Sequence, residues 1–196
     1  MKIKTKTPDY LNPALSAERR TRDLLSRMTV KEKVAQMLCV WEQKSRTLVD
    51  EHGNFDAEKA KSYFKQRLGL GQVGRPSDAG GGRNARQMAE LTNAIQKFFL
   101  ENSRLGIPVI FHEECLHGHA ANDATSFSQP IGLGATFDPE LVQKLFGMTA
   151  EEARVRGTHQ ALTPVVDVAR EPRWGRVEET YGEDPYLVSC MAVAAV

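Results

Sequence analysis

The sequence predicts an α/β protein whose parallel strands alternate with helices. Short apolar runs rich in β-branched residues, such as residues 109–111 (VIF) and 162–166 (LTPVV), are typical of buried parallel strands. Longer segments repeat apolar residues every three or four positions, most clearly between residues 84 and 102, which is typical of amphipathic helices. Strands separated by helices are joined by crossover connections, so these strands are expected to run parallel.

The composition is that of an ordinary globular protein. The 196 residues carry a formal net charge of +1, and 26% of them are charged. This balance gives no basic surplus for nucleic acid, and no apolar run is long enough to span a membrane. The N-terminus has lysines without a hydrophobic stretch behind them, so it does not resemble a signal peptide. Two compartments therefore stay open: the cytoplasm, or the periplasm if a signal has been removed.

Capping residues mark where the helices begin. Ser16 is the expected N-cap of a first helix that ends near Arg27. Thr29 and Glu32 form a capping box for a second helix, which runs to about residue 37. Residues 35–41 are ambiguous between the end of that helix and a strand. Further helices are expected over residues 56–67, 84–102, 138–156 with Asp138 as N-cap and Pro139 in the first turn, and 186–196 after Asp184-Pro185.

A glycine-rich segment, residues 69–74 (GLGQVG), matches the GxGxxG pattern of dinucleotide-binding proteins. Such a site needs its glycines between a strand and the start of a helix. Here a predicted helix precedes the glycines, and Arg75-Pro76 follows them. We therefore interpret residues 71–75 as a short strand and not as a nucleotide site. The next tract, residues 77–83 (SDAGGGR), is expected to be flexible.

Histidines and cysteines do not predict a metal centre. His112 and His117 are five positions apart, which is roughly 140° around a helix, so they would not converge on a zinc ion. Cys39, Cys115 and Cys190 are too few and too widely spaced for a disulfide framework or a metal cluster. Most of them are expected to be buried free thiols. No cofactor is predicted.

Two polar motifs follow predicted strands. HEECLHG, residues 112–118, follows the strand at 109–111, and a charged loop over residues 167–185 follows the strand at 162–166. In parallel α/β barrels the chemistry lies at the carboxyl ends of the strands. The charged loop alternates arginines with carboxylates around two aromatic residues. This pattern favours an ordered network, whose fixed donors suit hydroxyl-rich ligands.

These two motifs, HEECLHG and REPRWGRVEETYGEDP (residues 170–185), resemble the signatures of glycoside hydrolase family 3. The resemblance extends over nearly the whole chain, beginning at residue 28. It implies that residues 1–196 are part of the N-terminal domain of that family, an incomplete (β/α)8 TIM-type barrel. It also implies a retaining, exo-acting β-glycosidase of the β-glucosidase and β-xylosidase type. The expected substrates are oligosaccharides or aryl and alkyl glycosides.

The resemblance implies roles for three residues of this chain. Glu114 takes the place of the family's glycone-binding carboxylate, and Arg176 that of a glycone-binding arginine. His117 is expected in the pocket wall. Many hexose-specific members have Asp where this chain has Glu114, so we expect a pentose such as xylose, or a site that accepts both xylose and glucose. The nucleophile and the acid/base are expected beyond Val196, so this chain has no catalytic residue of its own and is expected to be inactive alone.

Other interpretations remain open. The chain could be a non-catalytic sugar-binding module, or it could belong to the β-N-acetylglucosaminidase branch of the same family. An incomplete barrel exposes strand edges, so the chain is expected to associate with the remainder of the same enzyme or with itself.

Overall fold

The computed structural model describes residues 7–78 and 82–196, so the tract predicted to be flexible lies partly outside the described residues. Four strands form one sheet: β1 (Cys39–Val40), β2 (Gln72–Gly74), β3 (Ile110–Glu114) and β4 (Gln160–Leu162). They follow the order β1-β2-β3-β4, and each neighbouring pair is parallel. The prediction of an α/β fold with a parallel sheet is confirmed.

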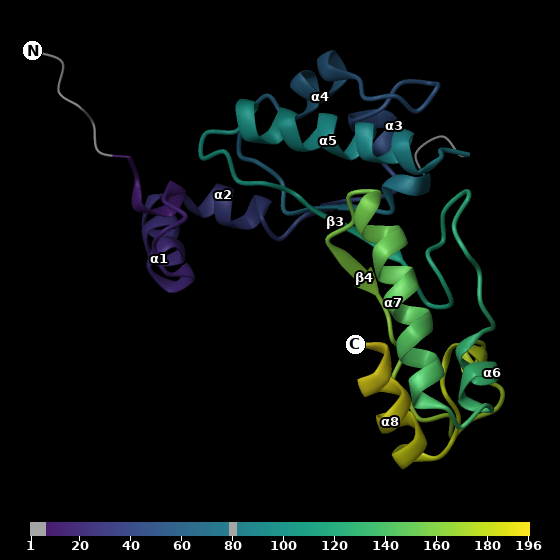
Figure 1. The fold of residues 1–196 in the computed structure, drawn as a ribbon. Helices are drawn as coiled ribbons and strands as arrows, with labels where there is room; N and C mark the ends of the chain where they lie inside the picture. Colours follow the sequence, from purple (N-terminus) through teal and green to yellow (C-terminus); the bar gives the residue numbers. More distant parts are fainter. Residues whose placement is uncertain (1–6, 79–81) are drawn as a thin grey trace, which may run out of the picture.

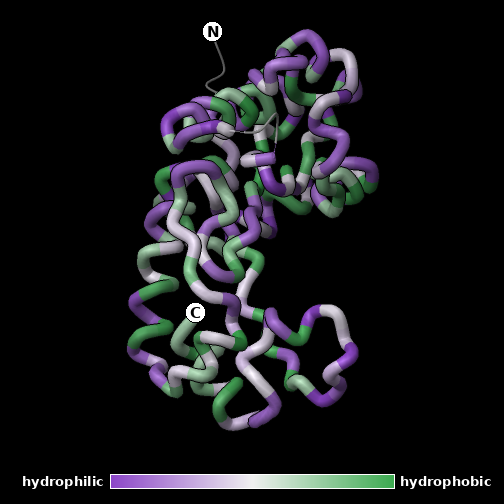
Figure 2. The backbone as a smooth tube through the Cα atoms, turned by 90° about the vertical axis from the view of Figure 1, so that its right-hand side faces the viewer, coloured by the Kyte–Doolittle hydropathy of each residue, from purple (hydrophilic) through white to green (hydrophobic). Residues whose placement is uncertain are grey.

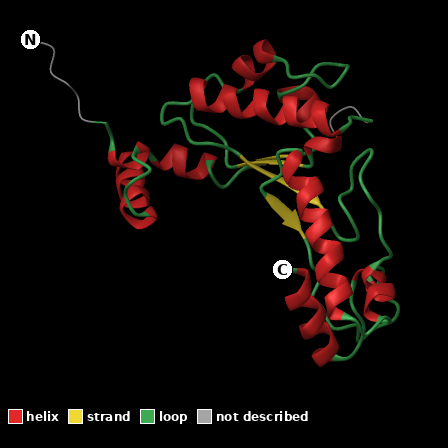
Figure 3. Cartoon of the chain, viewed as in Figure 1, coloured by secondary structure: helices red, strands yellow, loops and turns green. Residues whose placement is uncertain are grey.

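Helices connect and cover these strands, as Figure 1 shows, and Figure 3 places the strands between two groups of helices. None of the described helices is long and apolar enough to cross a membrane. The helices are α1 (Ala17–Arg27), α2 (Val30–Ala35), α3 (Lys44–Thr47), α4 (Ala57–Tyr63), α5 (Ala85–Asn102), α6 (Pro130–Gly134), α7 (Pro139–Val155) and α8 (Pro185–Ala195), with short 3-10 turns at η1 (Asp9–Leu11), η2 (Pro76–Asp78) and η3 (Val177–Glu179).

The predicted caps are confirmed. The Ser16 hydroxyl accepts a hydrogen bond from the backbone N–H of Arg19 at the start of α1. Thr29 and Glu32 form the capping box of α2, in which both reciprocal bonds are present. The buried carboxylate of Glu32 also pairs with Arg104 at 2.6 Å, and this bond is the main reason that its pKa falls to about 2. The pair fastens the N-terminal helices to the segment before β3.

The last strand lies earlier than predicted. We expected it at residues 162–166, but β4 ends at Leu162. Pairing with β3 sets these limits, since Gln160 to Leu162 align with His112 to Glu114. Pro164 has no backbone N–H with which to continue the ladder. The ambiguous segment 35–41 contains both possibilities: α2 ends at Ala35, and β1 begins at Cys39.

Two hydrophobic clusters hold the chain together. The first packs β1, β2 and β3 against α4 and α5, and its aromatic centre includes Phe98 and Phe99 with ring centroids 5.2 Å apart. The second lies among α6, α7 and α8, around the buried Tyr181. The clusters share no residue. Figure 1 shows α4 and α5, which contribute to the first cluster, in a different part of the molecule from α7 and α8, which contribute to the second.

The two faces of the sheet differ. Along β3, Phe111 and Glu113 are buried, whereas Ile110, His112 and Glu114 are more accessible. All three residues of β4 are exposed. Figure 2 shows how hydrophobic and hydrophilic segments alternate along the backbone, with hydrophobic stretches in both the upper and the lower part of the view. One face of β3 is therefore buried and its other face is more accessible, whereas both faces of β4 are exposed.

Candidate functional site

The carboxyl ends of the four strands meet at one edge of the sheet, because all four strands are parallel. The residues that come next are Trp41, Arg75, Cys115 and Thr163. In folds of this kind, loops at this edge carry the binding and catalytic groups. This edge is therefore the candidate site.

Glu114 is the last residue of β3 and is half-buried. Its neighbour Glu113 is fully buried on the other face, as strand alternation predicts. The two adjacent carboxylates therefore point in different directions and do not form a catalytic pair. Glu114 shares its face with His112, whose Nδ1 lies 2.8 Å from Oε1 of Gln72 on β2.

Glu113 instead supports the loop that follows β2. Its two carboxylate oxygens accept hydrogen bonds from the backbone N–H and the hydroxyl of Ser77, both at 2.7 Å. Burial raises the pKa of Glu113 to about 7, against the effect of these bonds. Lys44 lies nearby, buried, and its ammonium donates to the carbonyl of Gly74 at 2.8 Å. Burial also lowers the pKa of Lys44. Glu113 and Lys44 thus form hydrogen bonds within the protein, to Ser77 and to the carbonyl of Gly74.

Arg176 lies on the loop between β4 and α8. Its Nε donates to Oε1 of Glu179 at 2.8 Å, and this pairing is the main cause of the raised pKa of Arg176. The negative charges of Glu114 and Asp167 raise that pKa further. The loop that carries Arg176 leaves the sheet directly after Leu162, which pairs with Glu114 on β3. Arg173 on the same loop pairs with Glu171 through two bonds of 2.8 Å.

His117 lies in the loop after β3 and is half-buried. Its backbone carbonyl accepts from Phe127 at 2.8 Å, while its Nδ1 is buried without a partner among the described residues. One hydrogen-bonding position of this side chain is therefore unused among the described residues.

Sequence reasoning missed the contributions of the first two strands. Trp41 follows β1, Arg75 follows β2, and the guanidinium of Arg75 lies 5.3 Å from the centre of the indole ring. Arg75 also pairs with Asp78 at 3.0 Å, and its backbone adopts a positive φ of 47°. Non-glycine residues rarely occupy this conformation. The available signal was their position at the ends of β1 and β2, which is weak in a sequence when the strands are only two or three residues long.

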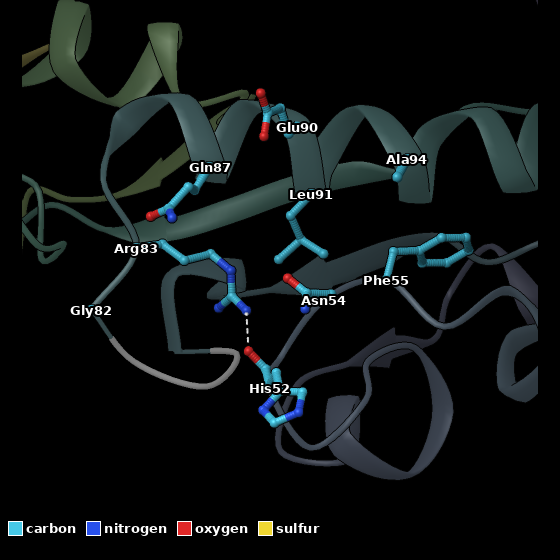
Figure 4. A pocket seen from close by; sticks show the side chains of 9 residues that line it. All are labelled: His52, Asn54, Phe55, Gly82, Arg83, Gln87, Glu90, Leu91 and Ala94. Carbon is cyan, nitrogen blue, oxygen red and sulfur yellow. Dashed lines mark hydrogen bonds between the residues drawn. The ribbon is translucent and has the colours of Figure 1, made fainter.

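Two hollows are lined by residues from the segments that follow β1 and β2. One of about 420 Å³ is bounded by Trp41, Lys44 and Asp78 among others. The second, of about 410 Å³, lies between α5 and the loop that carries His52, as Figure 4 shows. There Arg83 is buried and donates to the carbonyl of His52 at 3.2 Å. None of the predicted site residues lines either hollow.

Metal-binding side chains do not cluster in residues 7–78 and 82–196, where no three His, Cys, Asp or Glu side chains come together. All three cysteines are free thiols, as predicted. The expectation that most are buried was wrong, since only Cys115 is buried. Cys39 is exposed because it lies on the open face of the two-residue strand β1.

The family description "Glycosyl hydrolase family 3 N terminal domain" matches residues 29–196. The chain belongs to glycosyl hydrolase family 3. A putative β-xylosidase from Formosa agariphila is 35% identical over 192 residues, covering 98% of this chain. A β-glucosidase structure from Erythrobacter marinus superposes with a TM-score of 0.81 at 33% identity and covers 96% of the chain. The β-glucosidase from Listeria innocua in complex with glucose gives 0.71 at 31% identity, covering 92%.

These matches confirm the resemblance drawn from residues 112–118 and 170–185. They also confirm that the parallel sheet corresponds to part of the family's N-terminal barrel domain. The chain spans about a quarter of the length of these glycosyl hydrolase family 3 relatives: 25%, 24% and 23%, respectively.

Proposed function

We propose that this chain supplies the glycone-binding part of a retaining, exo-acting β-glycosidase that acts on β-xylosides or β-glucosides. The observation that carries the proposal is the pairing of Glu114 with Leu162, which places Glu114 beside the start of the loop that carries Arg176, at the carboxyl edge of the sheet. A carboxylate can accept bonds from two sugar hydroxyls, while a guanidinium donates to a third. Charge-assisted bonds of this kind are the strong ones. The family relationship, with its β-xylosidase and β-glucosidase relatives, supports this choice of ligand.

The chemistry requires more polypeptide than these residues provide. Retaining hydrolysis uses two carboxyl groups about 5 Å apart, one as nucleophile and one as acid/base. Glu113 cannot serve, because it is buried and bonded to Ser77. Glu114 is assigned to binding the sugar. These two residues are thus not a catalytic pair. As the family resemblance implies, we assign both catalytic carboxylates to polypeptide beyond Val196, and residues 1–196 to a partial barrel domain that is inactive alone.

The sugar preference follows from the length of the Glu114 side chain. Glutamate extends one methylene further than aspartate, so its carboxylate reaches into space that the hydroxymethyl group of a hexose would need. We therefore assign the site to xylose, or to a relaxed preference for xylose and glucose. His117, whose buried Nδ1 has no partner among the described residues, forms part of the pocket wall in this arrangement.

The test uses the enzyme at its full natural length with nitrophenyl xyloside, glucoside and N-acetylglucosaminide. Wild type is expected to hydrolyse the xyloside at least as well as the glucoside. Glu114→Asp should lower kcat/KM for the xyloside and raise it for the glucoside. Arg176→Met should lower both by roughly 10- to 150-fold, as expected for the loss of a hydrogen bond to a charged group.

Glu178→Asp is the matched control, because Glu178 is exposed on the same loop. It should leave both values unchanged. A large preference of the wild type for glucose would contradict the pentose assignment. Activity confined to the N-acetylglucosaminide would place the protein in that branch of the family instead.

A further inference from the structure

A long loop, residues 115–129, joins β3 to α6 and carries His117. None of the described helices or strands lies within it. Its two halves lie against each other, since the backbone N–H of Phe127 donates to the carbonyl of His117 at 2.8 Å. Gly118 has a φ of +105°, and a Cβ there would lie 2.0 Å from the carbonyl oxygen of Thr125. The second half of the loop therefore fixes the position of His117.

Glu152 on α7 holds this second half. Its carboxylate accepts two hydrogen bonds from Thr125, one from the backbone N–H at 2.9 Å and one from the hydroxyl at 2.8 Å. These two bonds, the backbone bond first, lower the pKa of Glu152. The ionised carboxylate is therefore the form that binds the loop, and hydrogen bonds to a charged acceptor are stronger than neutral ones.

Arg156, the C-cap of α7, holds the turn that precedes Thr125. Its side chain is buried, and its Nη2 donates to the carbonyls of Asn122 at 3.3 Å and Asp123 at 3.1 Å. Its Nη1 donates to the carbonyl of Glu152 at 2.9 Å, while its own carbonyl accepts from the hydroxyl of Thr92 on α5 at 3.3 Å. The loop is thus bonded to the end of one helix, which is bonded in turn to a second.

We propose that Glu152 and Arg156 are positioning residues for the sugar pocket, and that they hold the loop in the conformation that places His117 in the pocket wall. Neither side chain needs to touch the sugar. A group on a long loop keeps its geometry only where further contacts fix that loop. This inference rests on the proposed function, in which His117 forms part of the wall.

The experiment uses the enzyme at its full natural length with nitrophenyl xyloside. Glu152→Ala removes both bonds to Thr125 and should lower kcat/KM by roughly 10- to 100-fold, because a small displacement of a binding group is costly. Glu152→Gln can still accept from the N–H and should retain most of the activity. Glu151→Ala is the matched control, since Glu151 is exposed on the same helix, and it should leave kcat/KM unchanged.

Arg156→Lys keeps the charge but loses the fixed fork of the guanidinium, so it should lower kcat/KM less than Glu152→Ala does. A double-mutant cycle separates positioning from a general loss of stability. Glu152→Ala should cost less than about threefold when His117 is already alanine, because the group that it positions is then absent. The same full loss in both backgrounds would overturn the proposal, and so would unchanged activity in Glu152→Ala.

If the wild type hydrolyses neither the xyloside nor the glucoside, the proposed function fails, and the hold on the loop is tested separately. Hydrogen exchange read by mass spectrometry compares residues 115–129 in the wild type, Glu151→Ala and Glu152→Ala. Faster exchange of this segment in Glu152→Ala alone supports the hold. Exchange in Glu152→Ala that matches either the wild type or Glu151→Ala rejects it.

Discussion

At the scale of single residues, the most informative group is the carboxyl of Glu113. Its pKa is raised from 4.5 to about 7, chiefly by burial. The folded state therefore binds more protons than the unfolded state between these two pH values. It follows that the free energy of unfolding falls as the pH rises through this window. Glu113 thus holds the loop after β2, but its ionisation above about pH 7 places a negative charge in a buried position, which lowers the free energy of unfolding.

Glu113→Gln should flatten this pH dependence. Glutamine can accept from the N–H of Ser77 and donate to its hydroxyl, so both contacts survive without a charge. Since one pKa unit corresponds to about 1.4 kcal/mol, a fall of roughly 3 kcal/mol between pH 4.5 and 7 should disappear. Urea unfolding across this pH range measures it, with the exposed Glu178→Gln as control. A slope that persists in Glu113→Gln would show that another group causes it.

Among the elements, α7 has one glycine inside it and another just after it, and the same substitution should have opposite effects at the two. Gly157 follows the helix at φ +92°, and a Cβ there would overlap the hydroxyl of the buried Thr92. Gly147 lies inside the helix, and a Cβ there would meet nothing within 4 Å. The same change, glycine to alanine, therefore separates backbone strain from helix propensity.

Gly157→Ala should lower the free energy of unfolding by about 1–3 kcal/mol, because alanine rarely adopts this conformation and collides with Thr92. Gly147→Ala should raise it by about 1 kcal/mol through helix propensity. Denaturant midpoints of both variants in polypeptides of the same length provide the measurement. Effects of the same sign would contradict the assignment of the two environments.

Helices were more predictable than strands for a physical reason. A cap such as Ser16 or the pair of Thr29 and Glu32 satisfies backbone groups locally, so its signal lies within a few residues. The limits of β4 depend instead on its pairing with β3, which lies about fifty residues away. The short helices α3 and α6 were not expected, since four or five residues are too few to show a helical period.

The candidate site was predictable only in part, for the same reason. Glu114 and Arg176 could be named because each lies in a long, distinctive motif. The first motif was expected to follow its strand, but it begins inside β3 (Ile110–Glu114), whereas the second follows β4. Trp41 and Arg75 come together only through the parallel pairing of β1 and β2, which the sequence does not display. The roles of Glu114, Arg176 and His117 in binding remain proposals.

At the scale of the whole molecule, the exposed edge strand β4 is the feature expected to govern self-association. All three residues of β4 are exposed, and large apolar side chains are exposed elsewhere on the surface, including Val193 and Met37. An exposed strand edge can pair with another chain. The 196-residue polypeptide, expressed by itself, is therefore expected to self-associate.

Ala161→Lys places a charge in the centre of β4 and should shift the polypeptide toward monomer. Gln143→Lys adds the same charge at an exposed position of α7 and should not. Sedimentation velocity at low and high concentration distinguishes the two. A wild-type polypeptide that stays monomeric at high concentration would exclude pairing through this edge.

The separation of the two hydrophobic clusters also bears on biosynthesis. Every member of the first cluster lies between Val40 and Phe111, and every member of the second lies from Leu133 onward. The ribosome therefore completes all parts of the first cluster before it synthesises any part of the second. The first can condense while the later segment is still being translated, so the nascent chain need not keep all its apolar surface exposed until release.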